Sequence, residues 1–448
     1  MKTIKTLFRV IASKTVAIPI VVLLLTPLCS FADDTAALQA LLNAGPVTLP
    51  AGHAPYAVSG NLNVMYAFNL NGNTINSTVA GGGTLKVRNP GVTVSNGTIT
   101  GTWTAALAGN PNGASGIAIY ANNCTVTKMV ISNLSAYGIA VAGAYVNPTI
   151  TYNTITQVGY IAFFYDPETV AGVGGTFSYN TVDRSMLPPA TVQQVGVGIR
   201  GSTTGTNMTT NWSIVGNVIK MPLLPASDAA ECMEIRTMGN SVVSGNTFIG
   251  GSIGASAVRC TGIAITSNKF NSSQREAIEF ANCTSSSSNT NTITSSAGDG
   301  ILIDGSPASS GIVINGDIIS GATNSCIHAF TGTKNVTISG CTLTAVANGK
   351  AVNLQGTSAV NITSTAFNGN SAGSLAVMLD TCPGNLTING GTISNFTKCV
   401  VAISNTTSGL VTDYVTMSGV TVNGVPNALS TYVANGGAVG SHITVVNH

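Results

Sequence analysis

Ionisable side chains gather in the middle of a chain that otherwise carries little charge. Asp, Glu, Lys and Arg make up 7% of the 448 residues, against about 25% in an average soluble domain. Charge that served only solubility would be spread evenly. Here it concentrates in a stripe that consists of Arg200, Glu234, Arg236, Arg259, Glu279, Asp304 and His328. Groups of mixed sign held close together shift each other's pKa values, so this charged stripe is a candidate functional site. The alternative is a row of ion pairs that only supports a sheet.

Five residues of the charged stripe are candidates for catalysis. Arg236 and Arg259 would neutralise a substrate carboxylate or take part in proton abstraction. His328 is an alternative base, because an ordinary imidazole titrates near neutral pH. Glu234 and Glu279 would supply the acidic groups, and two such carboxylates are also what a glycoside hydrolase needs.

Binding is predicted from residues in and beside the stripe. Ca²⁺ prefers oxygen ligands, and its predicted ligands are Glu231, Glu234 and Glu279. The predicted contacts to substrate are Tyr120, Phe164, Tyr165, Arg200 and Asp304. The aromatic members of this set would offer flat faces to sugar rings.

Short strands must position these side chains. Segments such as Gly116-Ile-Ala-Ile119 and Gly300-Ile-Leu-Ile303 alternate apolar residues with others. Because side chains alternate along a strand, the residues that flank the inward aliphatic ones point outward. On this reasoning Phe164, Arg200, Glu234, Arg236 and the rest of the stripe lie on one outer face.

A second repeating pattern, apolar-x-x-Asn-x-apolar, returns along most of the chain. Examples are Ile150…Asn153…Ile155, Val243…Asn246…Phe248 and Ile265…Asn268…Phe270. A period of about 20–50 residues with short strands is typical of a solenoid, whose coils bury their apolar sides only by stacking. Stacked Asn side chains would bond to one another along a turn. The sequence therefore predicts an all-β, single-domain, right-handed parallel β-helix, since a β-propeller needs about 40 residues per blade.

The start of the chain fits a capped solenoid. Residues 33–43 predict a short helix with Leu38, Leu41 and Leu42 on one apolar face, and Asp33 or Asp34 as its N-cap. The strand-like Val47-Thr-Leu-Pro-Ala-Gly52 follows. This order resembles the first segment of pectate-lyase-like β-helices, in which the helix plugs the first coil. The predicted divisions are 1–32 signal peptide, 33–48 capping helix, 49–429 β-helix and 430–448 C-terminal cap.

The first 32 residues predict export. Lys2, Lys5 and Arg9 precede the apolar run 16–25, and Ser30-Phe31-Ala32 has the small-x-small pattern of a cleavage site. The mature chain is then expected outside the cytoplasm, with no membrane span. The net charge of +2 gives no basic surface, so nucleic acid is not an expected partner.

Eight cysteines follow the predicted signal peptide: Cys124, Cys232, Cys260, Cys283, Cys326, Cys341, Cys382 and Cys399. An even number in an exported chain is compatible with disulfides. Buried free thiols that act as small apolar residues are the alternative, and the spacing does not decide between them.

A second resemblance concerns the stripe itself. Glu234-Ile-Arg-Thr237, Asn240, Gly245-Asn-Thr-Phe248 and Arg259 are similar to the core of the alginate-lyase/chondroitinase-B-type β-helix lyases. That resemblance implies an acid that binds Ca²⁺ at Glu234 and an assisting Arg at Arg259. The sequence departs from the family at Met238-Gly239, where the family has a Lys base, and at Cys260-Thr261, where it has His-Gly.

The predicted function is an exported lyase that cleaves an acidic polysaccharide by β-elimination. A β-helix glycoside hydrolase is one alternative. A non-catalytic, adhesin-like solenoid that binds a glycan or a host partner is another.

Overall fold

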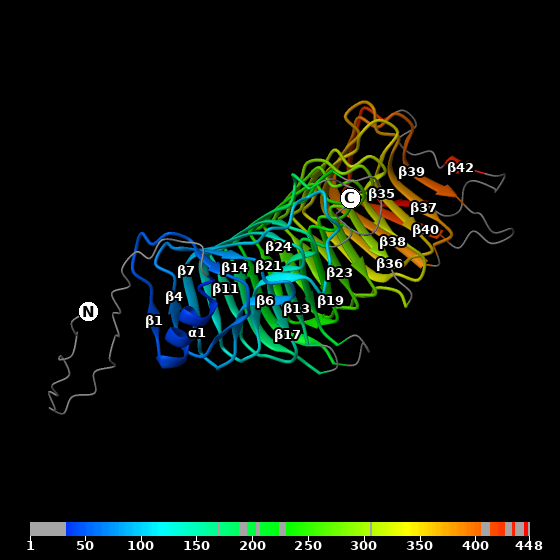
Figure 1. The fold of residues 1–448 in the computed structure, drawn as a ribbon. Helices are drawn as coiled ribbons and strands as arrows, with labels where there is room; N and C mark the ends of the chain where they lie inside the picture. Colours follow the sequence, from blue (N-terminus) through cyan, green and yellow to red (C-terminus); the bar gives the residue numbers. More distant parts are fainter. Residues whose placement is uncertain are drawn as a thin grey trace, which may run out of the picture.

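The computed structural model describes residues 33–167, 170–187, 195–202, 207–223, 230–304, 307–382, 384–404, 413–425, 432–434 and 443–446. Within them the chain winds into an elongated stack of coils with one helix, α1 (Thr35–Ala44), at the N-terminal end (Figure 1). The strands form two parallel sheets, of 15 and 28 strands. The expectation of an all-β parallel solenoid is confirmed.

The 15-stranded sheet takes one strand from each coil and carries the charged stripe on its outer face. Its strands are β3 (Leu62–Val64), β6 (Gly82–Val87), β8 (Ala114–Ile119), β10 (Tyr137–Ala142), β13 (Ile161–Asp166), β16 (Val197–Arg200), β19 (Met233–Arg236), β23 (Ala255–Val258), β26 (Ile278–Ala281), β29 (Ile301–Asp304), β32 (Ser325–Ala329), β35 (Lys350–Gln355), β37 (Leu375–Asp380), β39 (Cys399–Ser404) and β42 (Tyr432–Ala434).

The 28-stranded sheet takes up the other sides of the coils. Its strands are β1 (Val47–Thr48), β2 (Tyr56–Val58), β4 (Phe68–Asn69), β5 (Thr74–Ser77), β7 (Thr93–Thr100), β9 (Thr125–Leu134), β11 (Thr149–Thr151), β12 (Thr154–Val158), β14 (Val173–Ser178), β15 (Thr181–Asp183), β17 (Thr209–Val215), β18 (Val218–Lys220), β20 (Met238–Gly239), β21 (Val242–Ser244), β22 (Thr247–Ile249), β24 (Ala264–Thr266), β25 (Lys269–Asn271), β27 (Ser287–Asn289), β28 (Thr292–Ile293), β30 (Val313–Asn315), β31 (Ile318–Ser320), β33 (Lys334–Ser339), β34 (Thr342–Thr344), β36 (Ser358–Asn368), β38 (Gly384–Ser394), β40 (Asp413–Ser418), β41 (Thr421–Asn423) and β43 (Ile443–Val446).

The core is a set of apolar columns that run along the stack. One column contains Val141, Tyr165, Ile199 and Ile235, which lie in register and are fully buried. Complete burial of one such aliphatic side chain contributes about 1.5–3 kcal/mol. No single strand buries enough to fold alone, so each coil depends on its neighbours.

The predicted column of asparagines is present at the turn between the two strands that each coil contributes to the larger sheet. Asn217 Nδ2 donates to Asn246 Oδ1 at 2.9 Å, and Asn268 Nδ2 donates to Asn291 Oδ1 at 3.0 Å. The column ends on Asp317, whose Oδ1 accepts from the Asn291 backbone N–H at 2.6 Å. Burial raises the pKa of Asp317 to about 6.

Helix α1 covers the N-terminal coil as predicted, with Leu38 and Leu42 buried and Leu41 packed against the core. Asp33 Oδ1 accepts the Thr35 N–H at 3.0 Å, whereas Asp34 accepts the Ala57 N–H at 2.9 Å and ties the helix to β2. Four hydrogen bonds from Ser59 and Thr35 hold the pKa of Asp33 down to about 2.

The structure also bears on the predictions about a membrane span, the cysteines and the C-terminal cap. Within the described residues no helix is long and apolar enough to cross a membrane. Seven cysteines, at 124, 232, 260, 283, 326, 341 and 382, are buried free thiols. In the segment predicted as a C-terminal cap, β42 pairs with β39 and β43 pairs with β40, so both sheets extend into it. The predicted signal peptide lies outside the described residues.

Candidate functional site

The charged stripe follows one outward column of the 15-stranded sheet. Residues in register along this column are Ala118, Ala140, Phe164, Gly198, Glu234, Ser256, Glu279, Leu302, His328 and Asn353. A neighbouring column holds Arg200, Arg236, Val258, Ala281 and Asp304. Successive strands lie about 4.8 Å apart, so the position in the column gives the distance along the stripe.

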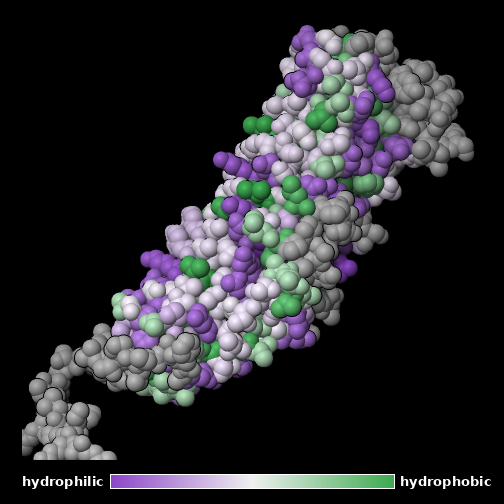
Figure 2. Space-filling model, turned by 45° about the horizontal axis from the view of Figure 1, so that its top comes forward, coloured by the Kyte–Doolittle hydropathy of each residue, from purple (hydrophilic) through white to green (hydrophobic). Residues whose placement is uncertain are grey.

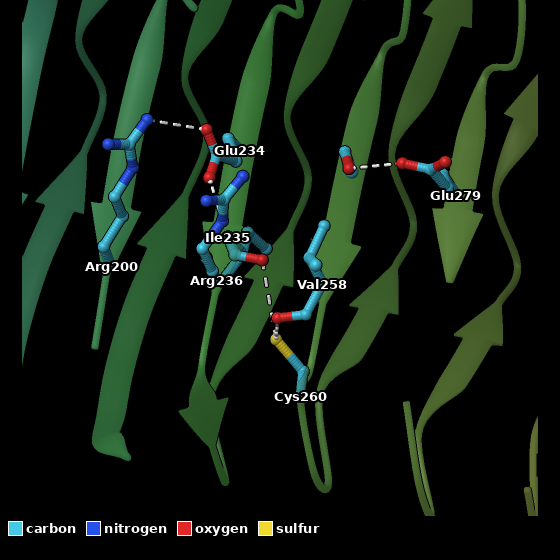
Figure 3. Close-up of polar contacts among 8 residues, drawn as sticks. Arg200, Glu234, Ile235, Arg236, Val258, Cys260 and Glu279 are labelled. Carbon is cyan, nitrogen blue, oxygen red and sulfur yellow. Dashed lines mark hydrogen bonds and ion pairs between the residues drawn. The ribbon is translucent and has the colours of Figure 1, made fainter. Parts of the chain in front are cut away.

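Two guanidinium groups meet at one buried carboxylate. Arg200 Nη2 lies 2.8 Å from Glu234 Oε2, and Arg236 Nε lies 2.7 Å from Glu234 Oε1 (Figure 3). The Glu234 side chain is 6% exposed, whereas that of Arg236 is 45% exposed. Because the two cations outnumber the one anion, this arginine cluster keeps a net positive charge beside solvent.

Glu231 completes the arginine cluster from the turn before β19. Its Oε2 is buried and has no hydrogen-bond partner among the described residues, and the same holds for Arg200 Nε. Burial raises the pKa of Glu231 well above the usual value, and the charges of Glu234 and Glu279 add to the rise. A carboxyl with this shift holds a proton at a pH where ordinary carboxyls are ionised.

Aromatic side chains lie beside the arginine cluster on its N-terminal side. Tyr137 stacks on Phe164 with centroids 5.3 Å apart and meets Tyr160 edge-on at 5.4 Å. The Arg200 guanidinium lies over the Phe164 ring at 5.1 Å. Gly198 leaves room for that ring, since a Cβ there would lie 3.1 Å from it. This aromatic wall (Tyr137, Tyr160 and Phe164) gives the stripe an apolar end.

The middle of the stripe holds two carboxyls outside the arginine cluster, Glu279 and Glu276. Glu279 Oε2 accepts from Ser256 Oγ at 2.5 Å. Glu276, in the turn before β26, lies 3.2 Å from Arg275 Nε. Burial raises the pKa of Glu276 to about 7, and the charge of Arg275 opposes that rise.

Further along the column, the stripe contains a histidine whose two ring nitrogens both contact polar side chains of the protein. His328 Nδ1 lies 2.8 Å from Asp299 Oδ2, and His328 Nε2 lies 3.0 Å from Asn353 Nδ2. These distances fit a neutral ring that donates from Nδ1 to the carboxylate and accepts at Nε2 from the amide. All three side chains of this histidine cluster are buried, and Phe330 covers the ring at 4.2 Å.

The prediction that Tyr165 faces a substrate is wrong. Tyr165 is fully buried, packs edge-on against Trp212 at 4.8 Å, and donates from its hydroxyl to the Tyr145 carbonyl at 3.1 Å. Alternation along β13 explains the error, because Phe164 points outward and its neighbour must therefore point inward. Phe164 is the member of the pair that reaches the stripe.

Arg259 does not lie in the outward column where the sequence reading placed it. Strand β23 ends at Val258, and Arg259 follows in a left-handed turn with φ 55°. Ser256 occupies the position between Glu234 and Glu279 instead. Arg259 is exposed at the edge of the sheet.

Two other predicted contacts lie away from the arginine cluster. Tyr120 follows β8, four strands before β19, where Arg88 lies over its ring at 4.3 Å and Tyr145 meets it edge-on. Asp304 ends β29, three strands after β19. The structure therefore brings together Arg200, Glu234 and Arg236 with Phe164 and Glu231, and it separates the rest.

The predicted Ca²⁺ ligands do not fit a cation in this arrangement. Both oxygens of Glu234 face guanidinium groups, and Glu279 is bonded to Ser256. Among the described residues no group of three or more His, Cys, Asp or Glu side chains is arranged to hold a metal ion. A cation would have to displace Arg200 and Arg236 from their partner.

Four residues of the site were missed in the sequence: Tyr137, Tyr160, Glu276 and Asp299. The position of the acidic residues could have been found from their spacing in the sequence. Glu231, Glu276 and Asp299 each stand three residues before a position of the outward column, in equivalent turns. A search restricted to strand positions passes over such residues.

Comparison with known proteins supports the fold. The family model described as "Right handed beta helix region" matches residues 254–415, less than half of the chain. No curated protein sequence matches. The described residues form a parallel β-helix, and the family match supports the right-handed form that the sequence predicted.

Three of the solved structures that are similar to this chain differ widely in what their names describe. The pre-mature gene product 12 of bacteriophage phi29 has a TM-score of 0.58 at 14% identity, over 90% of this chain and 55% of that one. PfbA, a surface adhesin of Streptococcus pneumoniae, has a TM-score of 0.47 at 12% identity, over 79% and 88%. An alginate lyase from Paenibacillus sp. str. FPU-7 has 0.41 at 14%, over 78% and 98%. The chain spans about half of the phage protein, and that likeness shows the fold alone.

Proposed function

We propose that the protein is an exported enzyme that binds an acidic polysaccharide along the charged stripe and cleaves it by β-elimination at the arginine cluster. One observation carries the proposal. Arg200 and Arg236 converge on Glu234 within 2.8 Å, next to a stacked aromatic wall. A sugar acid offers a carboxylate and an apolar ring face, and these are the two features that such a surface binds.

In the proposed reaction the arginine cluster neutralises the sugar carboxylate. Arg236 is exposed enough to reach the substrate, while Glu234 keeps its guanidinium oriented. Neutralisation makes the proton on the adjacent carbon easier to remove, and the glycosidic oxygen then leaves from the next carbon as a double bond forms. Arginine stays protonated, so it is not the base.

Glu231 is the proposed base. It belongs to the arginine cluster, three residues before Glu234, and its raised pKa makes its carboxylate a stronger base once ionised. His328 stands four strands from Glu234 in the column, which corresponds to about 19 Å. That separation is too large for His328 and Arg236 to act on one sugar.

Hydrolysis is the second candidate, and a specific observation favours it. Burial raises the pKa of Glu231 well above the usual value, which favours the protonated carboxyl that acid catalysis of glycoside cleavage requires. Under this alternative Glu231 donates a proton to the leaving oxygen. Glu279 would then be the second carboxylate.

A panel of acidic and neutral polysaccharides tests both reactions. β-Elimination gives unsaturated products that absorb ultraviolet light, whereas hydrolysis gives new reducing ends without that absorbance. The pH dependence separates the roles of Glu231. A base must be ionised, so lyase activity rises as the pH approaches the raised pKa. An acid must be protonated, so hydrolase activity falls over the same range.

Two matched variants complete this test. Glu231→Gln is expected to lose about 10²–10⁴-fold in rate. Glu276→Gln removes a buried carboxyl from an equivalent turn outside the arginine cluster and is expected to keep the rate. Binding of a glycan without any product would contradict both enzymes and leave the adhesin-like alternative.

Export is part of the proposal. It is supported by the basic and apolar segments before residue 33.

A further inference from the structure

One turn of the solenoid carries two tyrosines in an unfavourable backbone conformation. The turn lies between the two strands that a coil contributes to the larger sheet, away from the 15-stranded sheet that carries the stripe. Register along the strands brings one residue of each coil to the same place in this turn, and six of these residues, from successive coils, surround the tyrosines. They are Asn96, Lys128, Tyr152, Tyr179, Gly216 and Gly245, which follow paired strand positions.

These six residues have a left-handed backbone, with φ between 55° and 67°, and Ser267 and Thr290 at the same place in later coils have φ values of 54° and 51°. Gly and Asn adopt this conformation at little cost, whereas a bulky side chain there is strained. Tyr152 and Tyr179 have φ values of 57° and 55°. The turn imposes this conformation in successive coils, so the feature that distinguishes these two coils is their pair of aromatic side chains.

The two rings stack and remain open to solvent. Their centroids are 5.2 Å apart with an interplanar angle of 11°, and the residues are 57% and 53% exposed. The stacked pair therefore presents an aromatic surface to solvent, because more than half of each residue is exposed.

The neighbouring coils keep the surface around the rings low. Gly216 has no side chain, and a Cβ there would lie 2.7 Å from the Tyr179 ring. Gly245 is also bare, with only a backbone atom near its Cβ position. On the other side of Tyr152 stands the exposed Lys128. The result is a strip along the axis with a cation, two aromatic rings and two glycines.

The strip offers chemistry that small polar side chains lack. On the face drawn in Figure 2, many residues are pale, and purple and green ones are interspersed among them. The strip itself consists of two exposed, stacked tyrosines in register with an exposed lysine. Their ring edges, hydroxyls and charge match a sugar chain with acidic groups.

We infer that Tyr152, Tyr179 and Lys128 form a second glycan-binding strip, which holds an acidic polysaccharide along the solenoid axis away from the charged stripe. The choice of an acidic glycan rests on the proposed function and on the charge of Lys128. The strip binds without catalysis and raises the local concentration of polymer. Its effect is therefore largest for long chains, which can occupy the strip and the stripe together.

The experiment uses the full mature chain and a double variant, Tyr152→Asn with Tyr179→Asn. Asn96 occupies the same place in the turn, so the backbone is expected to tolerate both changes and the melting temperature to stay equal or rise. Retention in native gels that contain alginate, pectate or a glycosaminoglycan measures binding. The double variant is expected to bind about tenfold more weakly.

Two controls make the result specific. Tyr66→Asn removes a tyrosine that is 45% exposed elsewhere and is expected to leave retention unchanged. Lys128→Asn is expected to weaken retention in the acidic gels and to leave any retention in a neutral glycan gel unchanged. Equal retention of the double variant and the wild type would overturn the inference, and so would an equal loss in Tyr66→Asn.

The outcomes also separate this inference from the proposed function. A wild-type chain that binds the acidic gels through the tyrosines but yields no product supports the strip and contradicts the enzyme. If the double variant cleaves polymers of every length as fast as the wild type does, the result supports the enzyme and contradicts the strip.

Discussion

The arginine cluster and the histidine cluster lie on one outward column of one sheet, and they handle charge in opposite ways. In the first, two guanidinium groups share the single carboxylate of Glu234, and Arg236 stays 45% exposed. In the second, His328 is held on both ring nitrogens by Asp299 and Asn353, and all three side chains are buried. The first has bonding capacity left for a ligand. The second has used most of its own.

The difference shows that position on the stripe does not decide function. Equivalent positions on successive strands hold Ala140, Phe164, Glu234 and His328. The hydrogen-bond and charge partners of each side chain determine what it can do. A polar group whose hydrogen bonds are satisfied within the protein stabilises the fold. A surplus of one charge beside solvent is available to a substrate.

Breaking the arginine cluster should give the largest effect on stability. Glu234→Ala leaves two cations without their partner, and loss of one member of a buried ion pair costs several kcal/mol. We expect about 3 kcal/mol, at the low end because the Arg236 side chain is 45% exposed. Urea unfolding measures it. Glu279→Ala, which removes a carboxylate bonded to a serine, serves as the control and should cost less.

Breaking the histidine cluster should destabilise less and leave glycan cleavage intact. Asp299→Asn keeps the shape but removes the charged acceptor of the His328 N–H, for an expected loss of about 1–2 kcal/mol. Thermal unfolding and the product assay are run side by side. If Asp299→Asn loses most product formation while its stability is unchanged, the active centre lies at His328, and the assignment of function to the arginine cluster is contradicted.

Much of the fold was predictable because it rests on repetition. The asparagines that return every 22 or 23 residues, as at Asn246, Asn268 and Asn291, determine the turn, the period and the parallel stacking together. Helix α1 was predictable from its leucines and preceding aspartates. These features depend on local pattern, which the sequence carries directly.

The site was only partly predictable, because it depends on exact register. A shift of one residue exchanges inside and outside, and this is why Tyr165 was misplaced. Arg259 was assigned to a strand that ends one residue earlier. Asp299 and Glu276 lie in turns, where no alternating pattern marks the direction of a side chain. Glu234, Arg236 and Arg200 could be placed on the outer face because they share strands with aliphatic residues of known direction.

The most direct test compares Arg236→Gln with Arg259→Gln in binding and cleavage of acidic polysaccharides. Both substitutions remove one exposed arginine from the same region, but only Arg236 belongs to the arginine cluster. We expect Arg236→Gln to lose at least about tenfold in binding and most of the product, and Arg259→Gln to behave like the wild type. Equal behaviour of the two variants, or a loss confined to Arg259→Gln, would contradict the assignment of the arginine cluster as the functional centre.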